Sequence, residues 1–304
     1  MIDPQPDFQP EPGVPETLQP GVRRILAPNP SPMTFRGTNT YLVGDSDIAV
    51  IDPGPEESAH LGAILEALRP GQRVTHVLVS HAHLDHSPLA RRLADHCAAP
   101  VLAFGPATSG RSLSMQALAA SGLVGGGEGV DAAFEPDIRL SDTAEIAGAG
   151  WRITALHTPG HMANHLAFAL GDVLFSADLV MGWATSLVSP PDGDLGAFMA
   201  SLARLQTHPW RRFLPGHGAP VDDPAERLGE LIRHRRARAE SIARALAAAP
   251  ADAASLAAAI YTDTPPALLP AAERNVLAHL IEMCERNLAR PRGPLTAKAI
   301  FEAL

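Results

Sequence analysis

The chain has 304 residues, a hydrophobic fraction of 46% and a formal net charge of −9. This length allows one large domain or two smaller ones, with ample apolar material for a core. The acidic charge argues against a strongly basic nucleic-acid-binding protein. No apolar run reaches the roughly 18 to 20 residues that a membrane span needs, and no signal-peptide pattern opens the chain. We therefore expect a cytoplasmic protein that does not enter a membrane.

Strand and helix patterns alternate along most of the chain. Residues 1–20 hold six prolines and are expected to form an arm that is disordered or laid over the surface. Strands are expected at 22–27, 38–43, 48–51, 74–79, 101–104, 138–140, 151–157, 166–170, 173–175 and 213–214. Helices are expected at 57–69, 88–97, 194–206, 223–248, 252–260 and 268–289. Only helices follow residue 222, so we predict an α/β domain at 21–222 and a helical domain at 223–304.

The most distinctive stretch of the chain is the motif HAHLDH at 81–86. It follows an apolar, β-branched run that is typical of a buried strand, and it precedes a helical stretch. A β-like backbone sends alternate side chains the same way, so His81 and His83 can bind one metal together. Asp85 and His86 follow at the helix start and can face a second metal. Imidazole and carboxylate are standard zinc ligands, so this loop predicts a metal site that needs partners from elsewhere.

Three further metal-binding side chains each follow directly on a predicted strand. His161 comes in a TPGH turn, Asp178 follows the strand VLFSA, and His217 comes in a PGHG turn. Taken alone, each fits a turn or cap residue. Strand ends on one edge of a sandwich converge, however, so these side chains can meet the HAHLDH loop. Together they complete a set of seven ligands, which is what a two-metal site requires.

The motifs HAHLDH, TPGH, FSAD and PGHG, in that order, resemble those of the metallo-β-lactamase superfamily across about residues 21–220. The resemblance implies a four-layer αββα sandwich with two metal ions at the sheet edges. It implies that one ion is held by His81, His83 and His161, that the other is held by Asp85, His86 and His217, and that Asp178 bridges them. A bridging Asp is typical of the glyoxalase II-like hydrolases, lactonases and nucleases of the superfamily. The true β-lactamases lack it, so we do not expect a β-lactamase.

Four longer segments narrow the resemblance to the lactamase-beta-2-like group. They are GTNTYLVG at 37–44, TPGHMANH at 158–165, HRRARAESI at 234–242 and AERNVLAHLIEM at 272–283. This group carries a helical, winged-helix-like domain after PGHG, so residues 223–304 are expected to form one. Two departures are visible in this sequence. Met162 replaces the usual Thr after TPGH, and the tail from Asn287 shows no clear glycine-basic hairpin of the kind that forms a wing.

The ligand set defines the expected chemistry. Two metal ions about 3.5–4 Å apart can hold a bridging hydroxide, which attacks a carbonyl or phosphoryl centre. The ions also stabilise the oxyanion that develops. Asp85 is expected to be the catalytic residue, because it can accept or relay the proton of the water. Five His and two Asp suit two Zn²⁺ ions best, although iron or manganese can occupy one site.

Five other side chains are candidates for supporting the site or contacting the substrate. His165 is expected to support the site by a hydrogen bond, since a metal-ligating His usually has such a partner. Asp52 either orients a ligand or caps a turn. Trp183 and Thr185 either line the substrate pocket or pack structurally. Asn39 either is structural, which we favour, or reaches the substrate.

Three functions are consistent with these features. A binuclear metal-dependent hydrolase of a small ester, thioester or lactone is favoured by the acidic charge and the hairpin-poor tail. The alternative is a metal-dependent endoribonuclease that cleaves single-stranded RNA. The arginine cluster at 233–238 favours it, and the lack of an RNA-binding platform weakens it. That cluster is otherwise expected to be a solvated helix face, paired with Glu226, Glu230 and Glu240. The second alternative is a catalytically inactive scaffold or binding protein, against which the intact ligand set argues.

Overall fold

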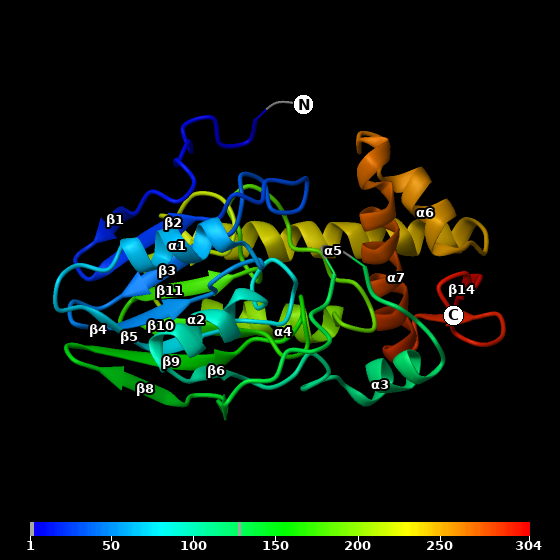
Figure 1. The fold of residues 1–304 in the computed structure, drawn as a ribbon. Helices are drawn as coiled ribbons and strands as arrows, with labels where there is room; N and C mark the ends of the chain where they lie inside the picture. Colours follow the sequence, from blue (N-terminus) through cyan, green and yellow to red (C-terminus); the bar gives the residue numbers. More distant parts are fainter. Residues whose placement is uncertain (1–2, 127–128) are drawn as a thin grey trace.

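Two β-sheets lie face to face in the centre of the molecule, with helices on both outer sides (Figure 1). The computed structural model describes residues 3–126 and 129–304. Within these ranges the first sheet has seven strands in the order β1 (Glu16–Gln19), β2 (Val22–Leu26), β3 (Asn39–Val43), β4 (Asp47–Ile51), β5 (Arg73–Leu78), β6 (Val101–Ala103) and β7 (Ile138–Arg139). Neighbouring strands are antiparallel from β1 to β4 and parallel from β4 to β7.

The second sheet is smaller. Its strands in the described part of the chain are β12 (Arg212–Pro215), β11 (Val173–Ala177), β10 (Leu166–Leu170), β9 (Trp151–His157) and β8 (Glu145–Gly148), in that order. The strands from β8 to β11 form an antiparallel meander, and β12 runs parallel to β11. Consequently β9, β11 and β12 all point the same way, and their carboxyl ends lie at one edge of the sheet.

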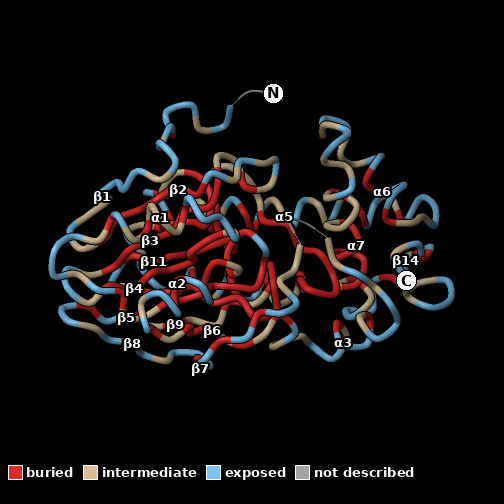
Figure 2. Tube along the Cα trace, in the orientation of Figure 1, coloured by how far each residue is buried: buried red, intermediate tan, exposed pale blue. Residues whose placement is uncertain are grey.

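Clusters of buried apolar side chains separate these layers. One cluster lies between the two sheets and includes Phe168. A second lies under α1 (Ser58–Glu66) and α2 (Leu89–Cys97), which cover the outer face of the first sheet. A third lies under α4 (Leu195–Gln206) and the first half of α5 (Pro224–Ala248), which cover the second sheet. Figure 2 shows the result, since the central strands are buried and the segment before β1 is mostly exposed.

The chain after α5 forms a second group of elements. They are α6 (Ala253–Ile260), the short 3-10 helix η1 (Pro266–Leu268), α7 (Leu269–Glu285) and a ribbon of β13 (Ala289–Pro291) and β14 (Phe301–Ala303). Their common core also takes in Ile242 and Leu246 from the second half of α5. It further includes Met115 and Leu118 of α3 (Leu113–Ala120), a helix between β6 and β7. The long helix α5 is therefore shared between the two packing units.

The expected four-layer αββα sandwich followed by a helical region is confirmed. Several segments differ from expectation. The expected elements did not include β8 and α3. Glu16–Gln19 was expected to lie within an irregular arm, but it pairs antiparallel with β2 as an edge strand. Prolines beside an edge strand are tolerated, because they remove no hydrogen bond from the interior of the sheet. The expectation that the tail lacks a hairpin is wrong, because β13 and β14 pair antiparallel and Phe301 is buried in the C-terminal core. Within the described ranges, every helix is too short or too polar to cross a bilayer.

Candidate metal centre

All seven predicted ligands follow the carboxyl ends of strands. The HAHLDH loop follows β5, and the loops with His161, Asp178 and His217 follow β9, β11 and β12. These loops meet at one edge of the sandwich, because the last three strands point the same way. The structure brings all seven side chains together there as overlapping groups of potential ligands. Each of the seven is at most 7% exposed.

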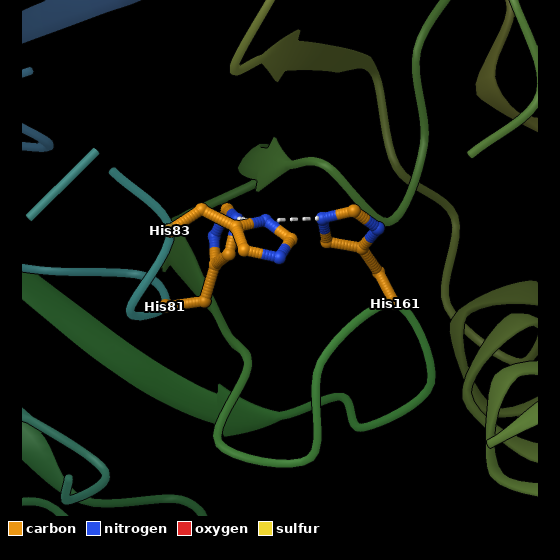
Figure 3. Close-up of side chains that lie close together, drawn as sticks. All are labelled: His81, His83 and His161. Atoms are coloured by element: carbon orange, nitrogen blue, oxygen red, sulfur yellow. Dashed lines mark hydrogen bonds between the residues drawn. The ribbon is translucent and has the colours of Figure 1, made fainter. Parts of the chain in front are cut away.

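The first half-site consists of His81, His83 and His161. Nδ1 of His83 lies 3.0 Å from Nε2 of His81 and 3.0 Å from Nε2 of His161 (Figure 3). Figure 3 shows His161 reaching this point from a different loop than the other two histidines. A ring nitrogen has either one proton or one lone pair, so Nδ1 of His83 cannot make both contacts as full hydrogen bonds. A shared metal ion satisfies all three nitrogens.

The second half-site consists of Asp85, His86 and His217. Oδ2 of Asp85 lies 3.1 Å from Nε2 of His217 and 3.4 Å from Nε2 of His86. The two ring nitrogens are 3.3 Å apart. On the far side of its ring, Nδ1 of His217 is paired with the carbonyl of Gly37 at 3.1 Å. This contact fixes the orientation of the ring, as is usual for a histidine that binds a metal.

Asp178 lies between the two half-sites. Its Oδ2 is 3.3 Å from Nε2 of His217 and 3.6 Å from Nε2 of His161, while its Oδ1 is 3.5 Å from Nε2 of His86. It therefore contacts ligands of both half-sites. The neighbouring loop passes so close that residue 216 must be glycine, since a Cβ on Gly216 would lie 2.3 Å from Oδ1 of Asp178.

Asp52 supports the site from behind, which is one of the two roles expected for it. Its Oδ2 lies 2.9 Å from Nδ1 of His86. Asp52 also accepts hydrogen bonds from the backbone N–H and the hydroxyl of Ser80, both at 2.7 Å. The Ser80 hydroxyl is in turn 2.9 Å from Nδ1 of His81. One buried carboxylate thus orients ligand rings of both half-sites, directly for His86 and through Ser80 for His81.

Burial dominates the electrostatics of the first half-site. Desolvation, helped by the neighbouring His161 ring, lowers the pKa of His83 to about 3. Desolvation, with the His86 and His83 rings, also lowers the pKa of His81 well below its ordinary value. These rings are therefore neutral at pH 7, and neutral imidazole is the form that binds a metal.

Carboxylates dominate the second half-site. Burial alone would lower the pKa of His217, but Asp178 and Asp85 raise it to about 10. Burial would also lower the pKa of His86, but these two carboxylates raise it well above its ordinary value. Burial would raise the pKa of Asp85, but His86 and His217 hold it below its usual range. Two ionised carboxylates in a buried place require positive charge beside them, which a metal ion can supply.

The donor set fits two metal ions. Oδ1 of Asp85 and Oδ1 of Asp178 are buried and have no hydrogen-bond partner within the described ranges. A buried carboxylate oxygen without a partner is costly, and these two lie among the imidazole nitrogens that zinc prefers. One ion could be held by His81, His83 and His161, and a second by Asp85, His86 and His217, with Asp178 in contact with both.

His165 and Asn39 lie behind the site. Nδ1 of His165 is 2.9 Å from the hydroxyl of Thr158, and its ring centroid is 5.2 Å from that of His81. Its contact with a ligand is therefore ring packing, and the expected hydrogen bond to a ligand is not formed among the described residues. The buried Asn39 amide donates to two backbone carbonyls of the loop that carries His217, at 2.9 and 3.0 Å. Asn39 thus fixes that loop, and it is not among the residues that line the cavity.

A cavity of about 210 Å³ opens beside the ligands. Its ligand side is formed by His83, Asp85, His161, Asp178 and His217. Its other sides are formed by Pro32, Met33, Met181, Trp183, Ala184, Thr185, Leu187, Tyr261, Thr264, Leu268, Ala271, Ala272 and Asn275. Trp183 and Thr185 thus line the cavity beside the candidate ligands. The sequence reasoning missed the contribution of α6, η1 and α7, because no motif marks those residues.

Residues 186–188 connect the first half-site to the C-terminal helices. The sequence reasoning missed this connection as well. The carbonyl of Leu187 is paired with Nδ1 of His161 at 2.7 Å. The backbone N–H of Val188 donates to Oδ1 of Asn275 at 3.1 Å. Arg235 donates to the carbonyl of Ser186 and, at 2.9 Å, to Oδ1 of Asn275. Side chains of α5 and α7 therefore hold the peptide that orients His161.

Arg235 differs from the other arginines of the 233–238 cluster. It is 2% exposed, lies 5.1 Å from the centroid of the Phe198 ring, and has no carboxylate partner within the described ranges. Burial lowers its pKa to about 10, so it stays charged at pH 7. The expectation of a solvated arginine face is wrong for this residue. The sequence does contain a signal for this burial. Arg235 stands at helical spacing between Leu231 and Ile242, within the apolar stripe of α5.

The αββα fold and its buried cluster of histidines and aspartates define the class of a metal-dependent hydrolase. Residues 33–236 match the Metallo-beta-lactamase superfamily, and residues 253–293 match the Beta-lactamase associated winged helix domain. The chain belongs to the metallo-beta-lactamase superfamily. The second match confirms the expected winged-helix-like character of the C-terminal region.

Individual proteins show the same relationship. The chain is 30% identical over 283 residues to a beta-lactamase-like protein 2 homolog of Drosophila melanogaster, and the match covers 88% of each protein. It is 30% identical over 240 residues to an atrochrysone carboxyl ACP thioesterase of Pseudocercospora fijiensis, which covers 76% of this chain and 62% of that protein. The crystal structure of a beta-lactamase domain protein from Burkholderia ambifaria is similar with a TM-score of 0.81 and 24% identity, covering 99% and 96% of the two chains. That likeness shows the fold alone.

Proposed function

We propose that the protein hydrolyses the carbonyl bond of a thioester, with esters and lactones as chemically related substrates. The observation that carries this proposal is the position of the ligand cluster at one side of a largely apolar cavity. An apolar cavity suits the acyl group of such a substrate. The similarity to a protein named as an ACP thioesterase supports the same reaction.

The cavity argues against the alternative of RNA cleavage. Binding of RNA phosphates depends on Lys and Arg side chains. No Lys or Arg is among the residues that line the cavity in the described part of the chain. On the two-stranded ribbon, Arg290 and Arg292 are both paired with Glu302, which offsets half of their charge.

The chain's own residues would act as follows in this reaction. Bound metal ions would supply an activated water near pH 7 and stabilise negative charge on the attacked carbonyl oxygen. Asp85 lines the cavity, and its Oδ1 has no hydrogen-bond partner among the described residues. Asp85 would therefore take up the proton that is released in the attack and pass it to the leaving thiolate. Asp178 would hold the two half-sites at a fixed separation, because it contacts both.

The test compares substrates in one set of assays. Protein loaded with zinc is incubated with a thioester, a lactone and single-stranded RNA, each with and without a chelator. We expect thioester hydrolysis that the chelator abolishes and no cleavage of RNA. RNA cleavage without thioester hydrolysis would overturn the proposal, as would the absence of bound metal after zinc loading.

The role of Asp85 has a test of its own. Asp85→Asn should lower turnover of the thioester by about a hundredfold or more, the usual contribution of a positioned acid or base. The exposed Asp95, changed to Asn, provides the matched control and should leave turnover unchanged. Near-normal turnover in an Asp85→Asn protein that keeps its metal content would refute the assignment.

A further inference from the structure

One side of the active-site cavity comes from the C-terminal elements. Tyr261 follows α6, Leu268 ends η1, and Ala271 and Asn275 lie in the first turns of α7. The opposite side consists of the metal ligands at the edge of the sandwich. A substrate whose carbonyl lies at the ligands must therefore place the rest of its structure against a wall from the second packing unit.

The part of this C-terminal wall that η1 and α7 form has little hydrogen-bonding capacity left. Leu268 and Ala271 present only hydrocarbon side chains. Asn275 is polar, but its Oδ1 already accepts two hydrogen bonds and its Nδ2 donates one at 3.3 Å, all within the protein. This part of the wall can thus recognise a ligand mainly by burying its apolar surface, whereas Tyr261 and Thr264 add hydroxyl groups to the lining.

The adjoining sides of the cavity are also largely apolar, although Nε1 of Trp183 is buried without a hydrogen-bond partner in the described part of the chain. Met33, Met181 and Trp183 contribute two flexible thioether side chains and one flat ring. Methionines adapt to irregular apolar ligands, because their side chains are unbranched and polarisable. Trp183 is held in place by stacking on Phe35, with ring centroids 5.0 Å apart. An acyl chain would therefore have an adaptable surface on one side and the wall of η1 and α7 on the other.

We infer that Leu268 and Ala271 form an acyl-binding wall that sets the length of the acyl chain the enzyme hydrolyses. This inference rests on the proposed thioesterase function. The winged-helix-like region would then act as the specificity element of the hydrolase. Each additional methylene that the cavity accommodates should raise kcat/KM by about fourfold, up to the length that fills it.

The experiment uses the acetyl, butanoyl, hexanoyl and octanoyl thioesters of N-acetylcysteamine with the full-length, zinc-loaded protein. Ala271→Phe fills part of the cavity and should lower kcat/KM for the longest chain by about tenfold or more, with little effect on the acetyl thioester. Leu268→Ala widens the cavity and should shift the preference toward longer chains. Ala267→Phe is the matched control, because Ala267 is the exposed neighbour of Leu268 and does not line the cavity.

A binding measurement separates this inference from the proposed function. Octanoyl-N-acetylcysteamine is titrated calorimetrically into metal-free protein, which should not hydrolyse it. Ala271→Phe should weaken binding by about tenfold, and Ala267→Phe should not. If the wild type hydrolyses thioesters but both lining variants keep its chain-length profile and affinity, the acyl-binding wall is refuted and the hydrolase stands. If no thioester is hydrolysed, the proposed function fails, and the binding data alone decide whether the wall binds acyl chains.

Discussion

The first half-site holds three histidines and no carboxylate of its own, whereas the second combines two histidines with Asp85. Burial lowers the pKa of His83 to about 3, while carboxylates raise the pKa of His217 to about 10. The pKa of the same side chain, equally buried, is thus moved in opposite directions by its surroundings. In both cases the arrangement suits a bound cation, either by offering neutral ligands or by requiring positive charge.

The two half-sites share the support of Asp52, which reaches His81 only through Ser80, but they differ in their closest supports. Asp52, at the end of β4 in the sandwich, orients His86 of the second half-site. His161 of the first half-site is oriented by a peptide that Arg235 and Asn275 of the C-terminal helices hold. The C-terminal region therefore contributes to the metal centre, although all seven candidate ligands come from the sandwich. Variants at each support should therefore affect the two half-sites unequally.

The largest effect is expected for Asp178→Asn, because Asp178 contacts ligands of both half-sites. Loss of its charge should lower turnover by on the order of a thousandfold, the upper range for one electrostatic group. Metal analysis after dialysis should show that both ions bind more weakly. The exposed Asp172, changed to Asn, is the surface control. Retention of both ions and of normal turnover would show that Asp178 is not shared.

Asp52→Asn should weaken the second half-site far more than the first. The substitution removes the negative charge from the side chain that contacts His86 directly. Loss of such an outer partner typically lowers metal affinity by about ten- to a hundredfold. Zinc affinity is measured in the wild-type background and in a His83→Ala background, which already lacks a complete first half-site. The Asp52→Asn effect should persist in both backgrounds. Its disappearance in the His83→Ala background would assign Asp52 to the first half-site.

Arg235→Lys should weaken the first half-site, by about tenfold in zinc affinity, the lower range for an outer partner. Lysine keeps the charge but cannot donate to both the Ser186 carbonyl and Asn275 in the planar fork that arginine provides. In the His83→Ala background the change should have no further effect on zinc affinity. The exposed Arg236, changed to Lys, is the control on the same helix. An equal effect in both backgrounds would mean that Arg235 acts only through general stability.

The smallest effect concerns His279, a buried histidine outside the metal centre. Burial, with nearby Arg235, lowers its pKa to about 3 from 6.5. Because the folded state excludes a proton that the unfolded state takes up below pH 6.5, this residue makes stability fall as pH drops from 6.5 toward 3. Between pH 6.5 and 5.5 its contribution should be about 1 kcal/mol.

Urea unfolding at these two pH values should therefore show a smaller loss of stability for His279→Leu than for the wild type. The exposed His96, changed to Leu, should keep the wild-type difference. If His279→Leu loses as much stability on acidification as the wild type does, burial alone does not set the pKa of this ring. The same explanation would then be weakened for the first half-site.

Local patterns in the sequence were sufficient for much of the fold. The β-branched run before HAHLDH, the turn motifs around His161 and His217 and the capped start of α5 at Asp223 each depend on a few neighbouring residues. β1 and the ribbon of β13 and β14 were not predictable in this way. Their strands have only three or four residues, and tertiary pairing rather than local preference stabilises them.

Four short motifs were enough to identify the seven candidate ligands, and their resemblance to one family implied the αββα sandwich, because each motif depends only on neighbouring residues. The opposite pKa shifts of the ligand histidines could be seen only in the folded chain, since they depend on burial and on carboxylates distant in the sequence. The tertiary structure also decided that Arg235 supports His161 and that Leu268 and Ala271 line the cavity. Those contacts join segments that no local pattern relates, and only packing of α5 and α7 against the sandwich brings them together.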